Sequence, residues 1–389
     1  MNIAERIARR RRQNGEIRLI RSYDALNPAA HVREPSGRES ALEQLLDWFE
    51  PAFDGEAPGN CYVWGPKGTG KSALLTALFS ELGRTSRDAS AIHTTTRAAD
   101  TAMPTFTYVD ARGTRSEVGF RHAVVDSLLA ERVPKQGVGR DHFTSLLEDR
   151  FRDTSRRAVV AVDHLGEPDT PPVAALDSFL ASAPDSVAWI AAGRSPPADL
   201  GVEVATSVHL PAYERYVLVD ILTSRTTRGL NRQAISHEEL RRIAEWADGD
   251  AHDALSTLFG AAVLASEADE RTIDPTLVDE GMAAVPRPSV SIGRVLSLPA
   301  NRQRVLRELL DCEPTERSVT TTAEALASDR ELSLSAGTIT RYLYELAESG
   351  ILERVRADRS DGLGRPPSRL ELRFPTLVFR RLFDARDEA

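Results

Sequence analysis

The residues Cys61–Trp64 (CYVW) run directly into Gly65–Ser72 (GPKGTGKS), and this stretch decides the fold. The first four residues are apolar or aromatic and predict a short buried strand, whereas Ala73–Leu82 has the periodicity of a helix. The eight residues between them match the phosphate-loop pattern G-x-x-x-x-G-K-[ST] at every fixed position. The glycines let the backbone turn tightly, so that its N–H groups point at phosphate oxygens beside the positive end of the next helix.

The loop predicts a site for a nucleoside triphosphate with Mg²⁺. We expect Lys71 to reach the β and γ phosphates and the Ser72 hydroxyl to bind Mg²⁺. The alternative is a chance glycine-rich turn, and the strand–loop–helix context argues against it. The loop residues predicted to bind the nucleotide are Gly65, Pro66, Lys67, Gly68, Thr69, Gly70, Lys71 and Ser72.

Segments with strand and helix patterns alternate after the loop. Such alternation implies a mostly parallel sheet covered by helices on both faces, so we expect an α/β domain over residues 36–210. The further predicted strands are Thr105–Asp110, Ala158–Asp163, Val187–Ala192 and Thr206–Leu210, and the predicted helices between them are Val118–Glu131, His142–Phe151 and Val173–Leu180.

Only helices are predicted over the next part of the chain. They are Glu214–Arg228, Ser236–Ala247, Ala251–Ala265 and Asp274–Ala283, and they predict a helical domain over residues 211–285. Residues 1–35 are rich in arginine and then in turn residues, and we interpret them as a basic N-terminal arm.

Residues 286–389 have the pattern of a winged helix. Helices are predicted at 301–311, at 321–328 with a Thr321-x-x-Glu324 capping box, and at 335–349, and two strands follow at Ile351–Val355 and Arg369–Phe374. Thr338 and Arg341 face outward on the third helix, in the half that enters the major groove of DNA in this fold. Arg359, Arg365 and Arg369 lie on or beside the wing, where arginines reach phosphates or the minor groove. The alternative is a winged helix used for protein contact.

Composition sets outer limits on these predictions. At about 150 residues per domain, 389 residues predict two or three domains. The net charge of −9 argues against a chain that coats nucleic acid over its whole surface. No apolar run reaches the roughly 18 residues of a membrane span, the N-terminus lacks the features of a secretory signal, and Cys61 and Cys312 have no metal-type spacing. We therefore expect a cytoplasmic protein without membrane contact.

Hydrolysis needs acids beyond the loop. Asp163 ends an apolar strand and is the predicted partner of Mg²⁺ through water, although it is also readable as a plain strand-end aspartate. His164 follows it in place of a glutamate base, and Glu167 could compensate only if the loop folds back. The sequence thus supports binding of a triphosphate and makes its turnover doubtful.

The order of a P-loop α/β domain, a helical lid and a C-terminal winged helix-turn-helix domain resembles the AAA+ replication initiators of archaea, of the origin recognition complex and cell division control (ORC/CDC) type. The resemblance covers about residues 20–385. It implies that nucleotide lies between base and lid, with Tyr213 and Arg225 among its ligands, and that His252 holds the second sensor position. The segments that carry the resemblance are Val32–Pro35 with Gly37-Arg38-Glu39, Val63–Ser72, Leu210–Tyr213 through Arg225, Gly249–Leu255 and Gly337–Leu352.

Departures from the family pattern imply a divergent paralogue with weak or absent ATPase activity. If Asp163-His164-Leu165 is the triplet that follows the family's Asp-Glu pair, that pair falls on Val160-Ala161 and both acids are missing. The first sensor, usually an asparagine, is replaced by Gly193-Arg194-Ser195, and the second, usually an arginine, by His252.

The leading hypothesis is an ATP-binding initiator of DNA replication that acts in origin recognition, in helicase recruitment or in regulation of a related initiator. The cofactors implied are ATP or ADP with Mg²⁺. The partners implied are double-stranded DNA with origin-type sites and a replicative helicase or a paralogous initiator, and the location is the nucleoid. Two alternatives stay open: a nucleotide-gated transcriptional regulator, and a non-hydrolysing partner of an active paralogue.

Overall fold

The protein is described from a computed structural model, in two compact units. Residues 31–212 form the α/β unit, and the residues up to Ala30 together with Tyr213 onward form the helical unit. The structure describes residues 18–54, 56–93, 103–114, 116–129, 131–135, 137, 139–153, 156–181, 186–312, 318–328, 332–356 and 368–387.

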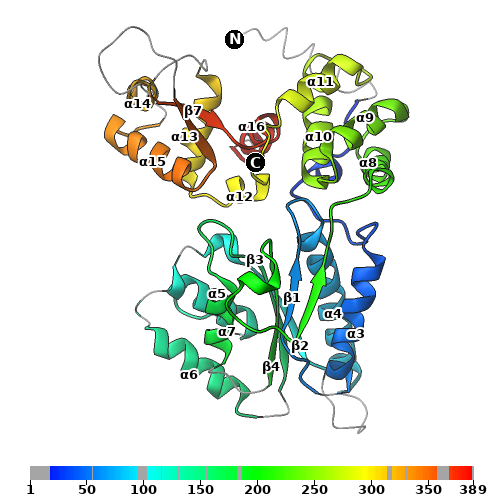
Figure 1. Ribbon diagram of the computed structural model, residues 1–389, viewed down its shortest axis with the longest axis vertical. Helices are drawn as coiled ribbons and strands as arrows, with labels where there is room; N and C mark the ends of the chain where they lie inside the picture. The colour runs from blue at the N-terminus through cyan, green and yellow to red at the C-terminus, as the bar shows by residue number, and fades with distance from the viewer. Residues whose placement is uncertain are drawn as a thin grey trace. The chain divides into compact units, whose positions relative to one another are not determined.

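The α/β unit contains a five-stranded parallel sheet in the order β2-β3-β4-β1-β5 (Figure 1). The predicted strands are confirmed within two residues at each end. The phosphate loop follows the strand that lies between β4 and β5, at the carboxyl edge of the sheet. The strands are β1 Cys61–Trp64, β2 Thr105–Asp110, β3 Ala158–Leu165, β4 Val187–Gly193 and β5 Thr206–His209.

Helices cover both faces of this sheet, as predicted (Figure 1). Successive strand residues point to opposite faces, so Cys61 and Val63 pack with α3 and α4 while Tyr62 packs with α5, α6 and α7. The helices are α3 Glu39–Phe53, α4 Lys71–His93, α5 Glu117–Leu128, α6 Arg140–Phe151 and α7 Val173–Leu180.

The helical unit begins with the described part of the predicted arm. Leu19, Ile20 and Leu26 are buried there, and Ile20 forms a β-bridge with Leu230, so residues 18–30 pack as part of this unit. The four predicted lid helices are present, and a short helix precedes them in the chain. These elements are α2 Tyr23–Leu26, α8 Arg215–Gly229, α9 His237–Ala247, α10 Ala251–Glu267 and α11 Pro275–Ala283.

The C-terminal part has the order of elements of a winged helix, in which three helices precede an antiparallel hairpin. The capping box was wrong: α14 begins two residues earlier than predicted, and its N-cap is Ser318, whose side chain accepts from the Thr321 N–H. Helices α12 and α16 were not predicted. The elements are α12 Ile292–Leu296, α13 Ala300–Asp311, α14 Val319–Ala327, α15 Ala336–Glu348, β6 Leu352–Arg356, β7 Ser368–Leu372 and α16 Thr376–Asp387.

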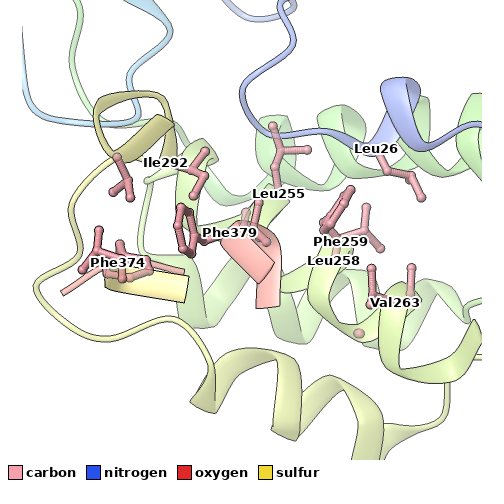
Figure 2. Packing of buried hydrophobic residues seen from close by; sticks show 14 of the residues in the cluster. Leu26, Leu255, Leu258, Phe259, Val263, Ile292, Phe374 and Phe379 are labelled. Carbon is pink, nitrogen blue, oxygen red and sulfur yellow. The ribbon is translucent and has the colours of Figure 1, made fainter. Parts of the chain in front are cut away.

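One hydrophobic core joins the lid helices to the C-terminal elements. Leu258 and Phe259 of α10 belong to the same buried cluster as Ile292, Phe374 and Phe379 (Figure 2). We call this the shared core. Within the described residues, no helix combines the length and apolar character that spanning a membrane requires.

Candidate functional site

The phosphate loop has the backbone that its glycines predict. Gly68 and Gly70 have φ values of 74° and 81°, which residues with a Cβ rarely adopt. A Cβ on Gly65 would lie 2.1 Å from the Leu210 carbonyl oxygen, so the loop can pass this strand exit only without a side chain. The loop therefore requires glycine at these positions for conformational and steric reasons.

Lys71 and Ser72 open α4 at the end of the loop. The Lys71 Nζ donates to the carbonyl oxygens of Gly65 and Pro66, both at 2.7 Å, and the side chain is 8% exposed. The Ser72 Oγ lies 3.3 Å from the His164 Nε2. The Lys71 ammonium thus lies against the carbonyl oxygens of the loop, and the Ser72 hydroxyl faces His164 at the end of β3.

Asp163 lies at the carboxyl end of β3 and meets the loop. It is 1% exposed, it accepts from the Tyr108 hydroxyl at 2.8 Å, and it accepts from the His164 N–H at 2.7 Å. Burial favours the neutral acid, but the adjacent His164 and the hydrogen bonds outweigh it and hold the pKa of Asp163 below its ordinary value. By contrast, Val160 and Ala161 are fully buried in the middle of the strand. If the family's Asp-Glu pair aligns with these two residues, the positions of the pair lie in the core of the sheet.

The segment after Asp163 folds back. His164 has a φ of 65°, a β-bulge follows Val162, and the Gly166 N–H donates to the Pro171 carbonyl. The fold-back brings Glu167 to 3.1 Å from both the His164 Nδ1 and the Arg194 Nη2.

Glu167 acts in this arrangement as the acceptor of two cationic partners. Its side chain is 4% exposed, and burial alone would raise its pKa. The hydrogen bond and charge of His164 and the charge of Arg194 instead lower that pKa to about 2. A carboxylate so stabilised is a weak base. His164 and Arg194 both contact the Glu167 carboxylate, and this Glu167 cluster occupies the positions where the glutamate base and first sensor are expected.

Replacing Glu167 tests how much the Glu167 cluster contributes to stability. Glu167→Gln is expected to lower the free energy of unfolding of the α/β unit by about 2 kcal/mol at about pH 7. The folded-state pKa of about 2 lies below the ordinary value of 4.5, so the stabilisation is present above about pH 4.5 and is lost as the pH falls towards 2. In urea unfolding, the difference between variant and wild type should therefore shrink on acidification. A difference that grows instead would contradict the assignment.

Two residues predicted to bind the nucleotide lie within the helical unit. Tyr213 is buried in the shared core, and its N–H donates to the Gly249 carbonyl. The guanidinium of Arg225 donates to the carbonyl oxygens of Ala25 and Ala30 at 3.0 and 2.7 Å, and burial lowers its pKa to about 10. Arg225, predicted as a ligand, thus fastens residues 25–30 to α8.

His252, the predicted second sensor, uses both ring nitrogens within the helical unit. Its Nε2 accepts from the Ile292 N–H at 2.8 Å, and its Nδ1 lies 3.1 Å from Asp253 Oδ1. The same carboxylate oxygen accepts from the Ser289 hydroxyl at 2.5 Å. His252 therefore links α10 to the segment that enters α12.

The structure describes three of the five residues predicted to contact DNA. Ile339, Leu343 and Leu346 are buried, as predicted, and they turn Arg341 outward with its side chain 65% exposed, while Thr338 is half-buried at the start of α15. Arg369 lies on β7, 3.0 Å from Glu371. Arg359 and Arg365 lie outside the described residues.

Some residues of the site were not predicted from the sequence. Tyr108, which binds Asp163, and Arg194, which binds Glu167, come from β2 and the end of β4. Their partners are 55 and 27 residues away in the chain, so no local spacing could have paired them. The one available signal was that Tyr108 lies in the carboxyl-terminal half of β2 and Arg194 directly after β4, since the carboxyl ends of parallel strands meet at one edge.

A parallel sheet of this order with a phosphate loop after β1 defines a P-loop protein of the AAA+ class. Residues 34–190 match the family model of the AAA ATPase domain, and residues 219–283 match that of the Cdc6 AAA+ ATPase-type lid domain. The chain thus carries an AAA ATPase domain followed by a lid of the Cdc6 type, and with the relatives given next it is similar to the ORC1/Cdc6 type of AAA+ proteins.

Two curated relatives illustrate the likeness. The chain is 24% identical over 256 residues to ORC1-type DNA replication protein 1 of Sulfolobus acidocaldarius, which is 62% of this chain and 61% of that protein. It is 22% identical over 366 residues to the ORC1-type DNA replication protein of Methanoregula boonei, which is 86% of this chain and 83% of that protein. The first match thus spans less than two thirds of the relative.

Solved structures give the same fold. The ORC1 protein of Aeropyrum pernix, in complex with DNA, superposes with a TM-score of 0.63 at 22% identity, over 95% of this chain and 99% of that chain. Cdc6p of Pyrobaculum aerophilum superposes with a TM-score of 0.53 at 19% identity, over 95% and 99%. At these identities the likeness establishes the fold.

Proposed function

We propose that this protein binds ATP with Mg²⁺ through Gly65–Ser72, hydrolyses it slowly or not at all, and binds duplex DNA as a replication initiator of the ORC1/Cdc6 type. The observation that carries the proposal is the intact loop with Asp163 beside Ser72, followed by His164 where a glutamate base is expected. The role in replication rests on the family. Origin recognition, helicase recruitment and regulation of a related initiator all fit it.

The residues present suit the cofactor. The Ser72 hydroxyl and the Asp163 carboxylate are hard oxygen donors of the kind Mg²⁺ prefers, and Lys71 supplies a positive charge inside the loop. The loop N–H groups and the start of α4 suit phosphate oxygens. When bound, the metal would neutralise charge on the phosphates, and this chain's own part is to hold the triphosphate in place.

Turnover is expected to be slow. We expect steady-state hydrolysis below about 10⁻³ s⁻¹ with and without duplex DNA, although ATP binds, because Glu167 is engaged by His164 and Arg194. Release of labelled phosphate, measured against the Lys71→Ala variant as background, tests this. Turnover of about 1 s⁻¹ would contradict the proposal and identify an overlooked base.

DNA binding is expected to depend on the exposed face of α15 and on the wing. Arg341→Ala and Arg369→Ala should each weaken duplex binding by about tenfold and flatten its salt dependence, because each removes a charge that can contact phosphate. The matched control is Arg84→Ala, which removes an exposed, Glu81-paired arginine from α4 in the α/β unit and should change little. Gel-shift titrations at several salt concentrations measure this. Equal losses in all three variants would sink the assignment of the surface.

The Glu167 cluster, in which His164 and Arg194 engage the carboxylate, also favours a second function, that of a non-hydrolysing partner of an active paralogue. Mixing the chain with an initiator paralogue and measuring hydrolysis separates the two. A change in the paralogue's rate of hydrolysis when this chain is added supports the partner, and a rate equal to that of the paralogue alone supports independent action. A nucleotide-gated regulator would instead bind promoter DNA and show no preference for origin-type repeats.

A further inference from the structure

Arg38 is a buried arginine that contacts the phosphate loop from outside the motif. It comes directly before α3 and is 8% exposed. Its Nε donates to the Thr69 carbonyl oxygen at 2.9 Å, and its Nη2 donates to the Pro211 carbonyl oxygen at 2.7 Å. A buried guanidinium is costly unless such bonds satisfy it, so these contacts fix the side chain in place.

The first contact controls a peptide plane of the loop. In a trans peptide the carbonyl of one residue and the N–H of the next point in opposite directions. By holding the Thr69 carbonyl, Arg38 makes the Gly70 N–H point in the opposite direction within the same plane. Thr69 is fully buried between Gly68 and Gly70, both with positive φ, so this peptide would otherwise be the easiest part of the loop to rotate.

The second contact ties the loop to a segment that is itself fixed. Just before Pro211, the Leu210 N–H donates to the Trp64 carbonyl at 2.8 Å, and His209 stacks on Trp64 with ring centroids 4.1 Å apart. The two acceptors of Arg38 come from different parts of the α/β unit, and only one of them belongs to the motif. The guanidinium fork reaches both at once, and the single ammonium of a lysine is less suited to do so.

We propose that Arg38 is a positioning residue for triphosphate binding, which acts by holding the Gly70 N–H towards the phosphates. This inference rests on the proposed binding of ATP at Gly65–Ser72. It predicts that removing Arg38 weakens ATP binding while every residue of the phosphate-loop motif stays intact.

The experiment compares three variants of the full chain by calorimetric titration with ATP and Mg²⁺. Arg38→Ala should raise the dissociation constant by about 10- to 100-fold, and Arg38→Lys by about 3- to 10-fold. Arg33→Ala removes an exposed arginine from the same segment and should stay within about twofold. Thermal unfolding checks that each variant is folded.

Chemical rescue separates positioning from general damage. Millimolar guanidinium chloride should lower the ATP dissociation constant of Arg38→Ala by at least about fivefold, and sodium chloride at the same concentration should not. Arg38→Ala that binds within about threefold of wild type, or that gains nothing from guanidinium, overturns the inference. If Arg38→Ala does not fold, Arg38→Lys decides: weaker binding supports the inference and unchanged binding overturns it. A wild-type chain that binds no ATP would refute the proposed function itself.

Discussion

Lys71→Ala is expected to abolish measurable nucleotide binding, with the dissociation constant for ATP rising by more than about 100-fold. Lys71 is the one lysine at the fixed basic position of the loop, and its Nζ lies inside the loop, 2.7 Å from two loop carbonyl oxygens. Alanine removes the charge that would balance the β and γ phosphates. Titration with a fluorescent ATP analogue in the presence of Mg²⁺ measures the loss.

The same loop offers the control. Lys67 is also among the loop residues predicted to bind the nucleotide, but it stands at a variable position of the motif and is half-buried. Lys67→Ala should therefore have the smaller effect and change the dissociation constant by no more than about threefold. Because lysine is otherwise found only at Lys135, the pair isolates position from total charge. Equal losses in both variants would mean that overall charge, and not the placement of Lys71, governs binding.

Phe379→Ala is expected to lower the free energy of unfolding of the helical unit by about 3 to 5 kcal/mol. The ring is fully buried in the shared core, with its centroid 5.2 Å from that of Phe374 (Figure 2). Its removal leaves a cavity that α10, α12 and α16 all border. Urea unfolding followed by far-UV circular dichroism measures the change.

An exposed phenylalanine provides the control for Phe379→Ala. Phe53 is 42% exposed at the end of α3, so Phe53→Ala should change the free energy of unfolding by no more than about 0.5 kcal/mol. The shared core further requires that α15 and the lid lose structure in one transition. A common core would be contradicted if, in wild type, the lid helices and α15 unfolded in two separate transitions and Phe379→Ala shifted only the transition of α15.

Much of the fold was predictable because its signals are local. The strand Ala158–Val162 is apolar at every position, as expected of a strand covered on both sides, and the loop motif fixed the order of strand, loop and helix. Helices α8 to α11 have periodic apolar positions that extend over several turns. The phosphate loop and Asp163 could be placed because strand ends in a parallel sheet gather at one edge.

The remainder depends on contacts that no local pattern carries. The family resemblance implied that Arg225 is a nucleotide ligand and that His252 holds the second sensor position. In the structure, their hydrogen-bond partners include Ala25 and Ala30 for Arg225 and Ile292 for His252. Glu167 reaches His164 only because His164 adopts a positive φ, which no residue pattern required. The partner of each of these side chains depends on which hydrogen-bonding groups the tertiary fold brings close to it.

The shared core has a consequence for how the chain can be divided. Residues 31–212 are one uninterrupted stretch, whereas the helical unit is assembled from both sides of it: Ile20 bridges to Leu230 and Arg225 holds Ala25 and Ala30. In topological terms, the nucleotide-binding half is an insertion into the other half. A fragment starting at Pro286 would carry α15 but would leave Phe374 and Phe379 without α10 to pack against. The α/β unit can be cut out as one piece, while the predicted DNA-binding helix shares its core with the lid and with residues 19–26.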